Sequence, residues 1–291
     1  MSRLGLLLLI CFACACEEPI PVPAPPVEPT LPPDPELLAA RPFEVITPLD
    51  YDGGTPLPLL MGLHGYGSSG ATLDSEFDLT RLAQSRGFLL VLPNGSVDGL
   101  GNRAWRPLAV AKTPFDREYL RAVLQSVKAT YAVDPARVFV FGFSQGGHMA
   151  HRMGCDSADL VAAFVSLAGQ VPTDPAFCQP ARPISALQVH GTADEAISYD
   201  GDPTDPNIPS AHAIIGVWGR NDGCGALQPT GRTLDLSYEV DGAETTVEAF
   251  DGCPSGIGVE LWTMHDVHHW PAPKPNLRTL LYGFLAAHAR N

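Results

Sequence analysis

Apolar residues along this chain fall into short runs separated by longer amphipathic or polar stretches. The runs have the length and the residue types of buried strands, and they occupy residues 57–63, 87–92, 138–143, 160–167, 184–189 and 259–264. Residues 73–85 and 116–131 are expected to form helices, and Asp134-Pro135 marks the end of the second. Strands that alternate with helices predict an α/β fold, with a mostly parallel, doubly wound sheet covered by helices on both faces.

The N-terminal pattern differs from the rest and predicts a targeting segment followed by a tether. Arg3 precedes an apolar run that ends in small residues and is too short to span a bilayer, so residues 1–16 are expected to be a signal peptide. Its end resembles a bacterial lipoprotein signal, with Cys16 as the lipidated mature N-terminus and Cys14 as the second candidate. An ordinary cleaved signal without lipid is the alternative. Residues 17–35 are rich in proline and predict an extended tether, which leaves residues 36–291 as a single folded domain.

Cysteine usage agrees with export to the cell envelope or beyond. Seven cysteines are present. Cys11 and Cys14 are expected to leave with the signal and Cys16 to carry the lipid, so four remain: Cys155, Cys178, Cys224 and Cys253. An even number in an exported protein indicates two disulfides. Pairing of nearest neighbours gives Cys155 with Cys178 and Cys224 with Cys253, although the sequence allows three pairings. None of the four has the short spacing of a zinc site, so no metal is expected.

Composition narrows the class of partner but not the substrate. The chain has 291 residues and is 45% hydrophobic, which is ample for a globular core. Its net charge of −14 is unfavourable for binding nucleic acid or an anionic membrane surface. We therefore expect a monomer that meets a membrane only through its N-terminal lipid.

The strongest chemical signal lies where the 138–143 strand ends. Ser144 stands in the frame Gly142-x-Ser144-x-Gly146, between that strand and a helix-compatible stretch. This is the context of a nucleophile elbow, a sharp turn that exposes a strained serine between two glycines. The alternative is a plain strand-turn-helix connection.

Serine needs a base to take its proton, and that base needs an acid to orient it. Asp194 follows the 184–189 strand, and three histidines, His265, His268 and His269, follow the 259–264 strand. The order serine, acid, histidine is that of α/β-hydrolases. Other acids near Asp194 that could serve are Glu195 and Asp200, and the histidines could be surface residues or metal ligands.

An oxyanion hole needs two backbone donors. The amide of Gln145, directly after the nucleophile, is the first candidate. The second is the amide of Tyr66 in the glycine-rich loop after the 57–63 strand. This loop could also be a plain glycine turn, and it lacks the ending of a phosphate-binding loop.

Several segments together resemble a known family. From about residue 57 to 271 the chain is similar to the secreted esterases grouped as poly(3-hydroxybutyrate) depolymerase-like enzymes and feruloyl or acetylxylan esterases of carbohydrate esterase family one. The matching pieces are Leu63-His-Gly-Tyr-Gly67, Val133-Asp-Pro-Ala-Arg-Val138, Gly142-Phe-Ser-Gln-Gly146, His190-Gly-Thr-Ala-Asp194, Tyr199-Asp-Gly201, Asn221-Asp-Gly-Cys224 and His268-His-Trp-Pro271.

The resemblance implies an α/β-hydrolase fold and assigns roles to particular residues. The family's catalytic histidine stands two residues before Trp-Pro, which selects His268. The resemblance also implies a disulfide between Cys224 and Cys253. Residues expected to line the substrate cleft are His64, Trp105, Trp218 and Trp270. One departure is Asp266-Val267, where the family usually has glycines.

The expected function is hydrolysis of carboxylic esters without a cofactor, through Ser144, His268 and Asp194. The resemblance implies feruloyl or acetyl esters of plant polysaccharides, or polyesters of the polyhydroxyalkanoate type. A serine peptidase of the same fold and a catalytically idle surface-binding module are the alternatives.

Overall fold

The computed structural model describes residues 35–106, 116–205 and 208–290. The expected signal peptide, Cys16 and nearly all of the proline-rich tether lie outside these ranges, so they stay predictions. Within the described ranges, no helix is both long enough and apolar enough to cross a membrane.

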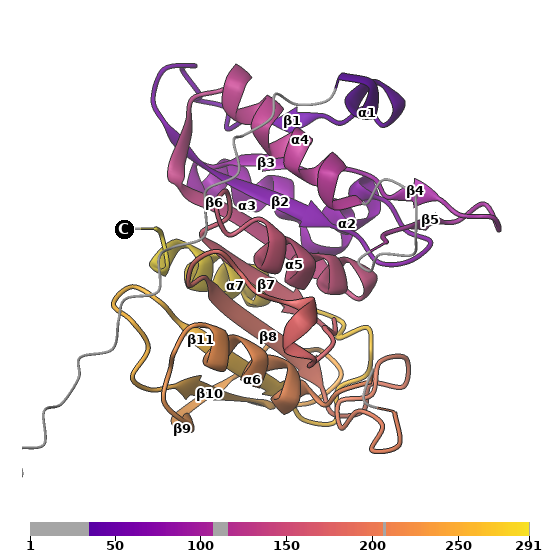
Figure 1. Ribbon diagram of the computed structural model, residues 1–291, viewed down its shortest axis with the longest axis vertical. Coiled ribbons are helices and arrows are strands. Elements are labelled where there is room, and N and C mark those ends of the chain that lie inside the picture. The colour runs from indigo at the N-terminus through magenta and orange to yellow at the C-terminus, as the bar shows by residue number, and fades with distance from the viewer. Residues whose placement is uncertain (1–34, 107–115, 206–207, 291) are drawn as a thin grey trace, which may run out of the picture.

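A nine-stranded sheet runs through the domain in the order β1-β3-β2-β6-β7-β8-β11-β10-β9 (Figure 1). Its strands are β1 Val45–Ile46, β2 Leu57–Leu63, β3 Leu89–Val91, β6 Val133–Phe143, β7 Ala163–Leu167, β8 Ser185–Gly191, β9 Leu227–Leu234, β10 Thr245–Phe250 and β11 Val259–Met264. The six strands from β3 to β11 in this order are parallel, and β1, β10 and β9 pair antiparallel at the two edges. The expected parallel sheet is therefore confirmed.

Helices cover both faces of the sheet (Figure 1). They are α1 Pro35–Ala40, α2 Gly70–Phe77, α3 Leu79–Arg86, α4 Asp116–Thr130, α5 Gln145–Asp156, α6 Ala211–Asn221 and α7 Pro275–Ala287, with a short 3-10 helix at Pro175–Phe177. Side chains of α4, α5 and α6 pack in one apolar cluster, and those of α2, α3 and α7 pack in another. These two clusters are the cores on opposite faces of the sheet, as the doubly wound pattern predicts.

The alternation of side chains along β8 shows how one strand serves both cores. Ala186 belongs to the cluster with α5 and α6, whereas Leu187 and Val189 belong to the opposite cluster. Because side chains alternate along a strand, Gln188 and His190 share the face of Ala186 and lie beneath α5 and α6. Both polar side chains are fully buried there.

Two parts of the fold differ from the sequence-based expectation. The helix expected over 73–85 is two helices, because Asp78 adopts a left-handed conformation with φ 49° between α2 and α3. The strands β9 and β10 were not expected. In β9 the side chains are mostly exposed, and the strand contains Pro229 and Gly231, so the apolar alternation that identifies a half-buried strand is absent.

Both nearest-neighbour disulfides are present. Cys155, in the last turn of α5, is bonded to Cys178, and Cys224, just after α6, is bonded to Cys253. The pairing that the sequence left open is thereby settled, and each bond fastens the C-terminal end of a helix to a neighbouring loop.

A buried acid lies close to the second disulfide, at the end of α6. Asp222 caps the end of α6, and its Oδ1 accepts a hydrogen bond from the Ile184 amide at 3.2 Å. Its Oδ2 is buried and has no partner among the described residues. Burial raises the pKa of Asp222 from 3.8 to about 7. Below about pH 7 this acid consequently prefers its neutral form in the folded protein.

We predict that Asp222 makes the domain less stable as the pH rises. The folded protein holds this proton more tightly than the unfolded chain does, so the free energy of unfolding should fall between pH 3.8 and about 7. Removal of the charge in Asp222→Asn should abolish this part of the fall, which is on the order of 3 kcal/mol. Thermal unfolding at pH 5 and pH 8 measures the effect, with Asp241→Asn, an exposed turn residue, as the matched control. Equal pH dependence in all three proteins would contradict the prediction.

Candidate active site

Ser144 occupies a strained turn at the C-terminal end of β6. Its φ of 56° and ψ of −119° lie outside the regions that residues with side chains usually adopt. A Cβ on Gly142 would lie 2.0 Å from the Gly146 oxygen, and a Cβ on Gly146 would lie 2.0 Å from the Leu63 oxygen. Both glycines are therefore required by close backbone approach, which supports the elbow interpretation of this sequence.

The Ser144 hydroxyl is joined to a histidine and an aspartate by two short hydrogen bonds. Ser144 Oγ lies 2.9 Å from Nε2 of His269, and the other ring nitrogen, Nδ1, lies 2.8 Å from Oδ2 of Asp194. Asp194 follows β8 and His269 follows β11, and these two strands are adjacent in the sheet. The serine, the histidine and the aspartate thus lie at the carboxyl ends of parallel strands, where sites gather in sheets of this kind.

The histidine in this position is His269, and the assignment of His268 is corrected. The His268 side chain is 60% exposed, and both its backbone amide and its Nδ1 donate to Oε2 of Glu239, at 2.9 and 3.1 Å. The preceding residue, Val267, is fully buried, and its carbonyl accepts from the Ala193 amide at 3.1 Å. Burial of Val267 sets the direction of the loop, so that His268 turns to Glu239 and His269 turns to Ser144.

The three histidines of this segment have different partners. Nε2 of His265 lies 2.9 Å from the Thr246 hydroxyl, His268 binds Glu239, and His269 joins Ser144 to Asp194. Across the described ranges, no group of three or more His, Cys, Asp or Glu side chains is arranged to hold a metal ion.

Asp194 carries a buried carboxylate that is held by several donors. Its Oδ1 accepts from the amides of Ala196 and Ile197, at 2.9 and 2.7 Å, and its Oδ2 lies near both His269 and His190. Burial by itself would raise the pKa of Asp194, but the hydrogen bonds from His190, His269 and the Ile197 amide hold it well below its ordinary value. The carboxyl is therefore an anion at neutral pH.

The other two acids considered for this role, Glu195 and Asp200, are placed differently from Asp194. Oε2 of Glu195 accepts from the His269 amide at 3.3 Å, whereas Asp200 is exposed. No pattern in the sequence singles out Glu239, which comes from a distant polar segment and contacts the loop only in the folded structure. The sequence marks His190 only as part of the motif His190-Gly-Thr-Ala-Asp194.

The two residues expected to supply oxyanion donors lie close to Ser144. Gln145 is the first residue of α5, and the loop carrying Tyr66 lies over the elbow, since a Cβ on Gly65 would be 3.4 Å from Cβ of Ser144. Within the described part of the chain, neither the Tyr66 nor the Gln145 amide donates to a protein acceptor. Two unengaged amides beside a helix N-terminus are suited to stabilising negative charge.

A small hairpin holds the Tyr66 loop in place. Its strands are β4 Ser96–Val97 and β5 Arg103–Ala104. The Tyr66 hydroxyl donates to Oδ2 of Asp98 at 2.8 Å and accepts from Nδ2 of Asn102 at 3.0 Å, while the Gly67 amide donates to the Arg103 carbonyl at 2.8 Å. The position of the Tyr66 amide is thus fixed from outside its own loop.

Three of the four residues expected to line the cleft are fully buried, which corrects that expectation. His64 and Trp105 lie beneath the loops around the nucleophile, where the Trp105 indole donates to the His64 carbonyl at 2.8 Å. The Trp105 amide donates to the Gln145 side chain at 2.8 Å, so this pair supports the site from below. Trp218 is a residue of α6, and its side chain packs inside the core.

Trp270 is the one member of that set with an accessible ring, at 38% exposure. Its ring meets Phe77 and Phe143 edge-on, with centroids 5.6 Å away in each case, and Phe143 also lies against the His269 ring at 5.3 Å. The site therefore has an aromatic border on the side of the histidine.

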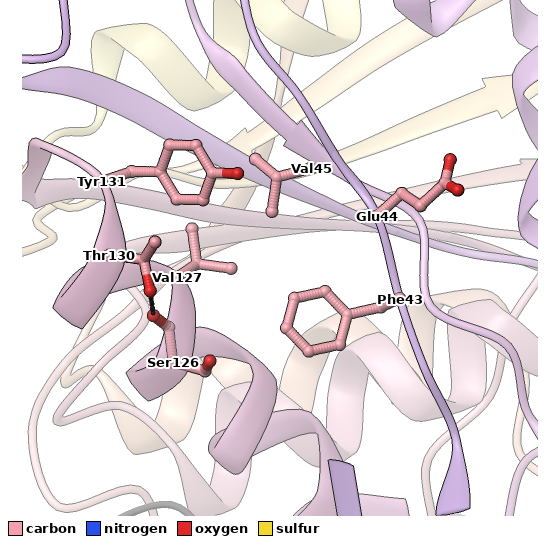
Figure 2. Close-up of a pocket in the computed structure, with 7 residues that line it drawn as sticks. All are labelled: Phe43, Glu44, Val45, Ser126, Val127, Thr130 and Tyr131. Atoms are coloured by element: carbon pink, nitrogen blue, oxygen red, sulfur yellow. Dashed lines mark hydrogen bonds between the residues drawn. The ribbon is translucent and has the colours of Figure 1, made fainter. Parts of the chain in front are cut away.

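A surface pocket of about 470 Å³ lies elsewhere, between α4 and the segment that contains β1 (Figure 2). Phe43, Val45, Val127 and Tyr131 supply most of its wall, and Figure 2 shows the Glu44 carboxylate directed away from the Phe43 ring. The Thr130 hydroxyl is already engaged by the Ser126 carbonyl at 2.9 Å. This pocket contains neither the serine nor the histidine described above, so the chemistry lies outside it.

Comparisons with known proteins agree with the geometry. Feruloyl esterase B of Piromyces equi is 25% identical over 76% of this chain and 41% of its own length. Feruloyl esterase C of Emericella nidulans is 27% identical over 84% of this chain and 82% of its own. The acetyl xylan esterase from Aspergillus awamori superposes with a TM-score of 0.60 over 83% of this chain and 93% of its own, at 12% identity, which shows a shared fold.

These findings confirm the expected resemblance to feruloyl and acetylxylan esterases, while the depolymerase-like activity stays a prediction. The chain spans 65%, 41% and 20% of the lengths of three curated relatives that it matches. A family model described as phospholipase/carboxylesterase matches residues 54–202, which include the elbow and Asp194. Because this match covers more than half of the chain, the protein belongs to the phospholipase/carboxylesterase family of α/β-hydrolases.

Proposed function

We propose that the protein hydrolyses carboxylic esters, with Ser144 as nucleophile, His269 as general base and Asp194 as the orienting acid. The observation that carries the proposal is the unbroken pair of hydrogen bonds, 2.9 Å from Ser144 to His269 and 2.8 Å from His269 to Asp194. A serine on a strained elbow that contacts a base, which in turn contacts a buried carboxylate, is the arrangement that activates a hydroxyl for attack.

Acylation follows from this geometry. As Ser144 Oγ forms a bond to the carbonyl carbon, its proton passes to Nε2 of His269, and the Asp194 carboxylate stabilises the resulting imidazolium. Negative charge then develops on the carbonyl oxygen, where the Tyr66 and Gln145 amides donate to it. When the tetrahedral intermediate collapses, His269 returns the proton to the departing alcohol oxygen and an acyl-serine remains.

Deacylation repeats these steps with water in place of the serine. His269 takes a proton from water as the water oxygen attacks the acyl carbon, and the same two amides hold the oxyanion. Collapse breaks the bond to Ser144 Oγ, which recovers its proton from His269. The carboxylic acid leaves, and no cofactor is consumed.

The substrate class we propose is a feruloyl or acetyl ester of a polysaccharide. The names of the relatives support this class, and the accessible ring of Trp270, which packs on Phe77 and Phe143, supports an aromatic acyl group. An aromatic ring packed against such a border gains about 0.5–1.5 kcal/mol beyond the burial of its area. A polyester substrate remains the alternative for the same site.

We further propose that the protein is exported and acts outside the cytoplasm. Two disulfides among the described residues support an oxidising compartment, because such bonds persist in exported proteins and are rare in cytosolic ones. The N-terminal signal pattern, with Cys16 as the candidate for lipidation, supports the same conclusion.

Ser144→Ala should abolish hydrolysis of a short-chain chromogenic ester such as 4-nitrophenyl acetate. Loss of the nucleophile should lower kcat by at least about 10³-fold, because only the oxyanion donors and substrate binding remain. Initial rates of the purified wild type and variant measure this, and circular dichroism confirms that both are folded. Turnover that is equal in the two proteins would overturn the proposed function.

Substitution of the two adjacent histidines should separate their roles. His269→Ala should lower kcat by about 10³-fold or more, because it removes the base, whereas His268→Ala should change kcat by less than about 10-fold. The two variants are matched controls for each other, since each deletes an imidazole from the same loop. A larger loss in His268→Ala than in His269→Ala would restore the assignment drawn from the family pattern.

The aromatic border should determine preference for the acyl group. Trp270→Ala should lower kcat/KM for methyl ferulate about 3- to 10-fold more than kcat/KM for an acetyl ester, because the small acyl group does not reach a ring contact. The ratio of the two values is the readout, so a general loss of activity from disturbance of His269 cancels. An unchanged ratio would show that Trp270 does not contact the acyl group.

A further inference from the structure

A line of buried polar side chains leads through the core to Asp194. It contains Trp218 on α6, His151 on α5, and Gln188 and His190 on β8, and all four side chains are fully buried. Polar groups in a core are costly unless they are hydrogen-bonded, and apolar residues could fill the same space. None of these four takes part in the chemical steps proposed above.

Hydrogen bonds connect these side chains in sequence. The Trp218 indole Nε1 lies 2.9 Å from Nδ1 of His151, and Nε2 of His151 lies 2.9 Å from Oε1 of Gln188. Nε2 of Gln188 lies 3.1 Å from Nδ1 of His190. Nε2 of His190 then lies 2.8 Å from the Ile197 carbonyl oxygen and 3.2 Å from Oδ2 of Asp194.

The direction of every bond in this line is determined by groups that have only one role. An indole N–H only donates, so Nδ1 of His151 must accept and Nε2 of His151 must carry the proton that Oε1 of Gln188 receives. The Gln188 amide is oriented independently, because its Nε2 also donates to the Gly169 carbonyl at 3.0 Å. Nδ1 of His190 consequently accepts from Gln188, which leaves the proton of the neutral His190 ring on Nε2.

We propose that His190 is a positioning residue for the triad, held by Trp218, His151 and Gln188 as the neutral Nε2–H tautomer. Its single Nε2–H is shared between the Ile197 carbonyl, at 2.8 Å, and Oδ2 of Asp194, at 3.2 Å. The same oxygen, Oδ2, receives Nδ1–H of His269 at 2.8 Å. The amides of Ala196 and Ile197 hold Oδ1 of Asp194, and the His190 donor holds Oδ2. The carboxylate is then held in a single orientation, in which Oδ2 accepts from Nδ1–H of His269.

The surroundings of His151 favour its neutral form. Burial lowers the pKa of His151 to about 3, and burial likewise lowers the pKa of the neighbouring His148. The ionisable groups around His190 are Asp194 below it, His151 and His148 on α5, Tyr199 at 5.7 Å between ring centroids, and His269 across Asp194. Asp194 is the only anion that contacts the His190 ring among the described residues.

The inference rests on the proposed esterase function, and two variants at position 190 test it. His190→Leu removes the donor, whereas the amide of His190→Gln places an N–H close to the position of imidazole Nε2. Because a misoriented base costs up to about 10²-fold in rate, His190→Leu should lower kcat about 10- to 100-fold with KM changed less than about twofold. His190→Gln should recover most of that loss.

The matched control for these rates is His212→Gln, which alters a half-exposed histidine on α6 that pairs with Glu248 outside the line. Thermal unfolding of each variant gives the folded fraction by which kcat is corrected. Wild-type kcat in His190→Leu, or an equal loss in both position-190 variants after this correction, would overturn the inference. A wild type without Ser144-dependent turnover would instead contradict the proposed function.

A measurement on the wild type removes the dependence on activity and on the folding of variants. Nitrogen-15 NMR of labelled histidine side chains at pH 7 distinguishes the two neutral tautomers and the imidazolium, with His190→Gln identifying the His190 signals. We expect neutral Nε2–H tautomers for both His151 and His190. An Nδ1–H tautomer or a charged ring at His190 would refute the inference whether or not the protein is an esterase.

Discussion

The structure around the active site depends on one buried negative charge. The Asp194 side chain has no exposed surface, and a carboxylate removed from water is unstable unless donors replace its hydration. Here the donors are two amides of its own loop, which bind Oδ1, and two histidines, which contact Oδ2. The requirement to satisfy this charge therefore orders the Asp194 loop and fixes one ring nitrogen of His269.

The strained elbow is the second constraint, and the order of strands links it to the first. Ser144 follows β6, Asp194 follows β8 and His269 follows β11, and the parallel order β6-β7-β8-β11 brings these ends to one edge of the sheet. The Ser144 amide donates to the Leu167 carbonyl at the end of β7 at 2.8 Å, so the intervening strand also supports the turn. Residues separated by 125 positions in the chain meet because of this topology.

Sequence reasoning predicted the features that depend on local pattern. Apolar runs identified the parallel strands, because strands buried on both faces need continuous apolar residues. Ser144 and Asp194 were singled out because each follows such a run, and in the structure both contact the His269 ring. The edge strand β9 was missed because its exposed side chains carry no such pattern.

Features that depend on long-range contacts were not predictable in the same way. The choice between His268 and His269 is made by Glu239 and by burial of Val267, and no local pattern reveals either contact. The family resemblance implied that Trp105 and Trp218 lie at the cleft. Their indole N–H groups instead find buried acceptors, the His64 carbonyl and His151, which is what allows these rings to be fully buried.

The disulfides connect stability to the geometry behind Asp194. His151 lies one turn before Cys155 on α5, and Cys155 is bonded to Cys178. The Asn221 side chain, at the end of α6, donates to the Cys178 carbonyl at 3.3 Å, and the next cysteine, Cys224, is bonded to Cys253. The helices that carry His151 and Trp218 are thus fastened to the same loop at their C-terminal ends. Since the indole of Trp218 orients His151 only while α5 and α6 keep their relative positions, the disulfides support the hydrogen-bond line that ends at Asp194.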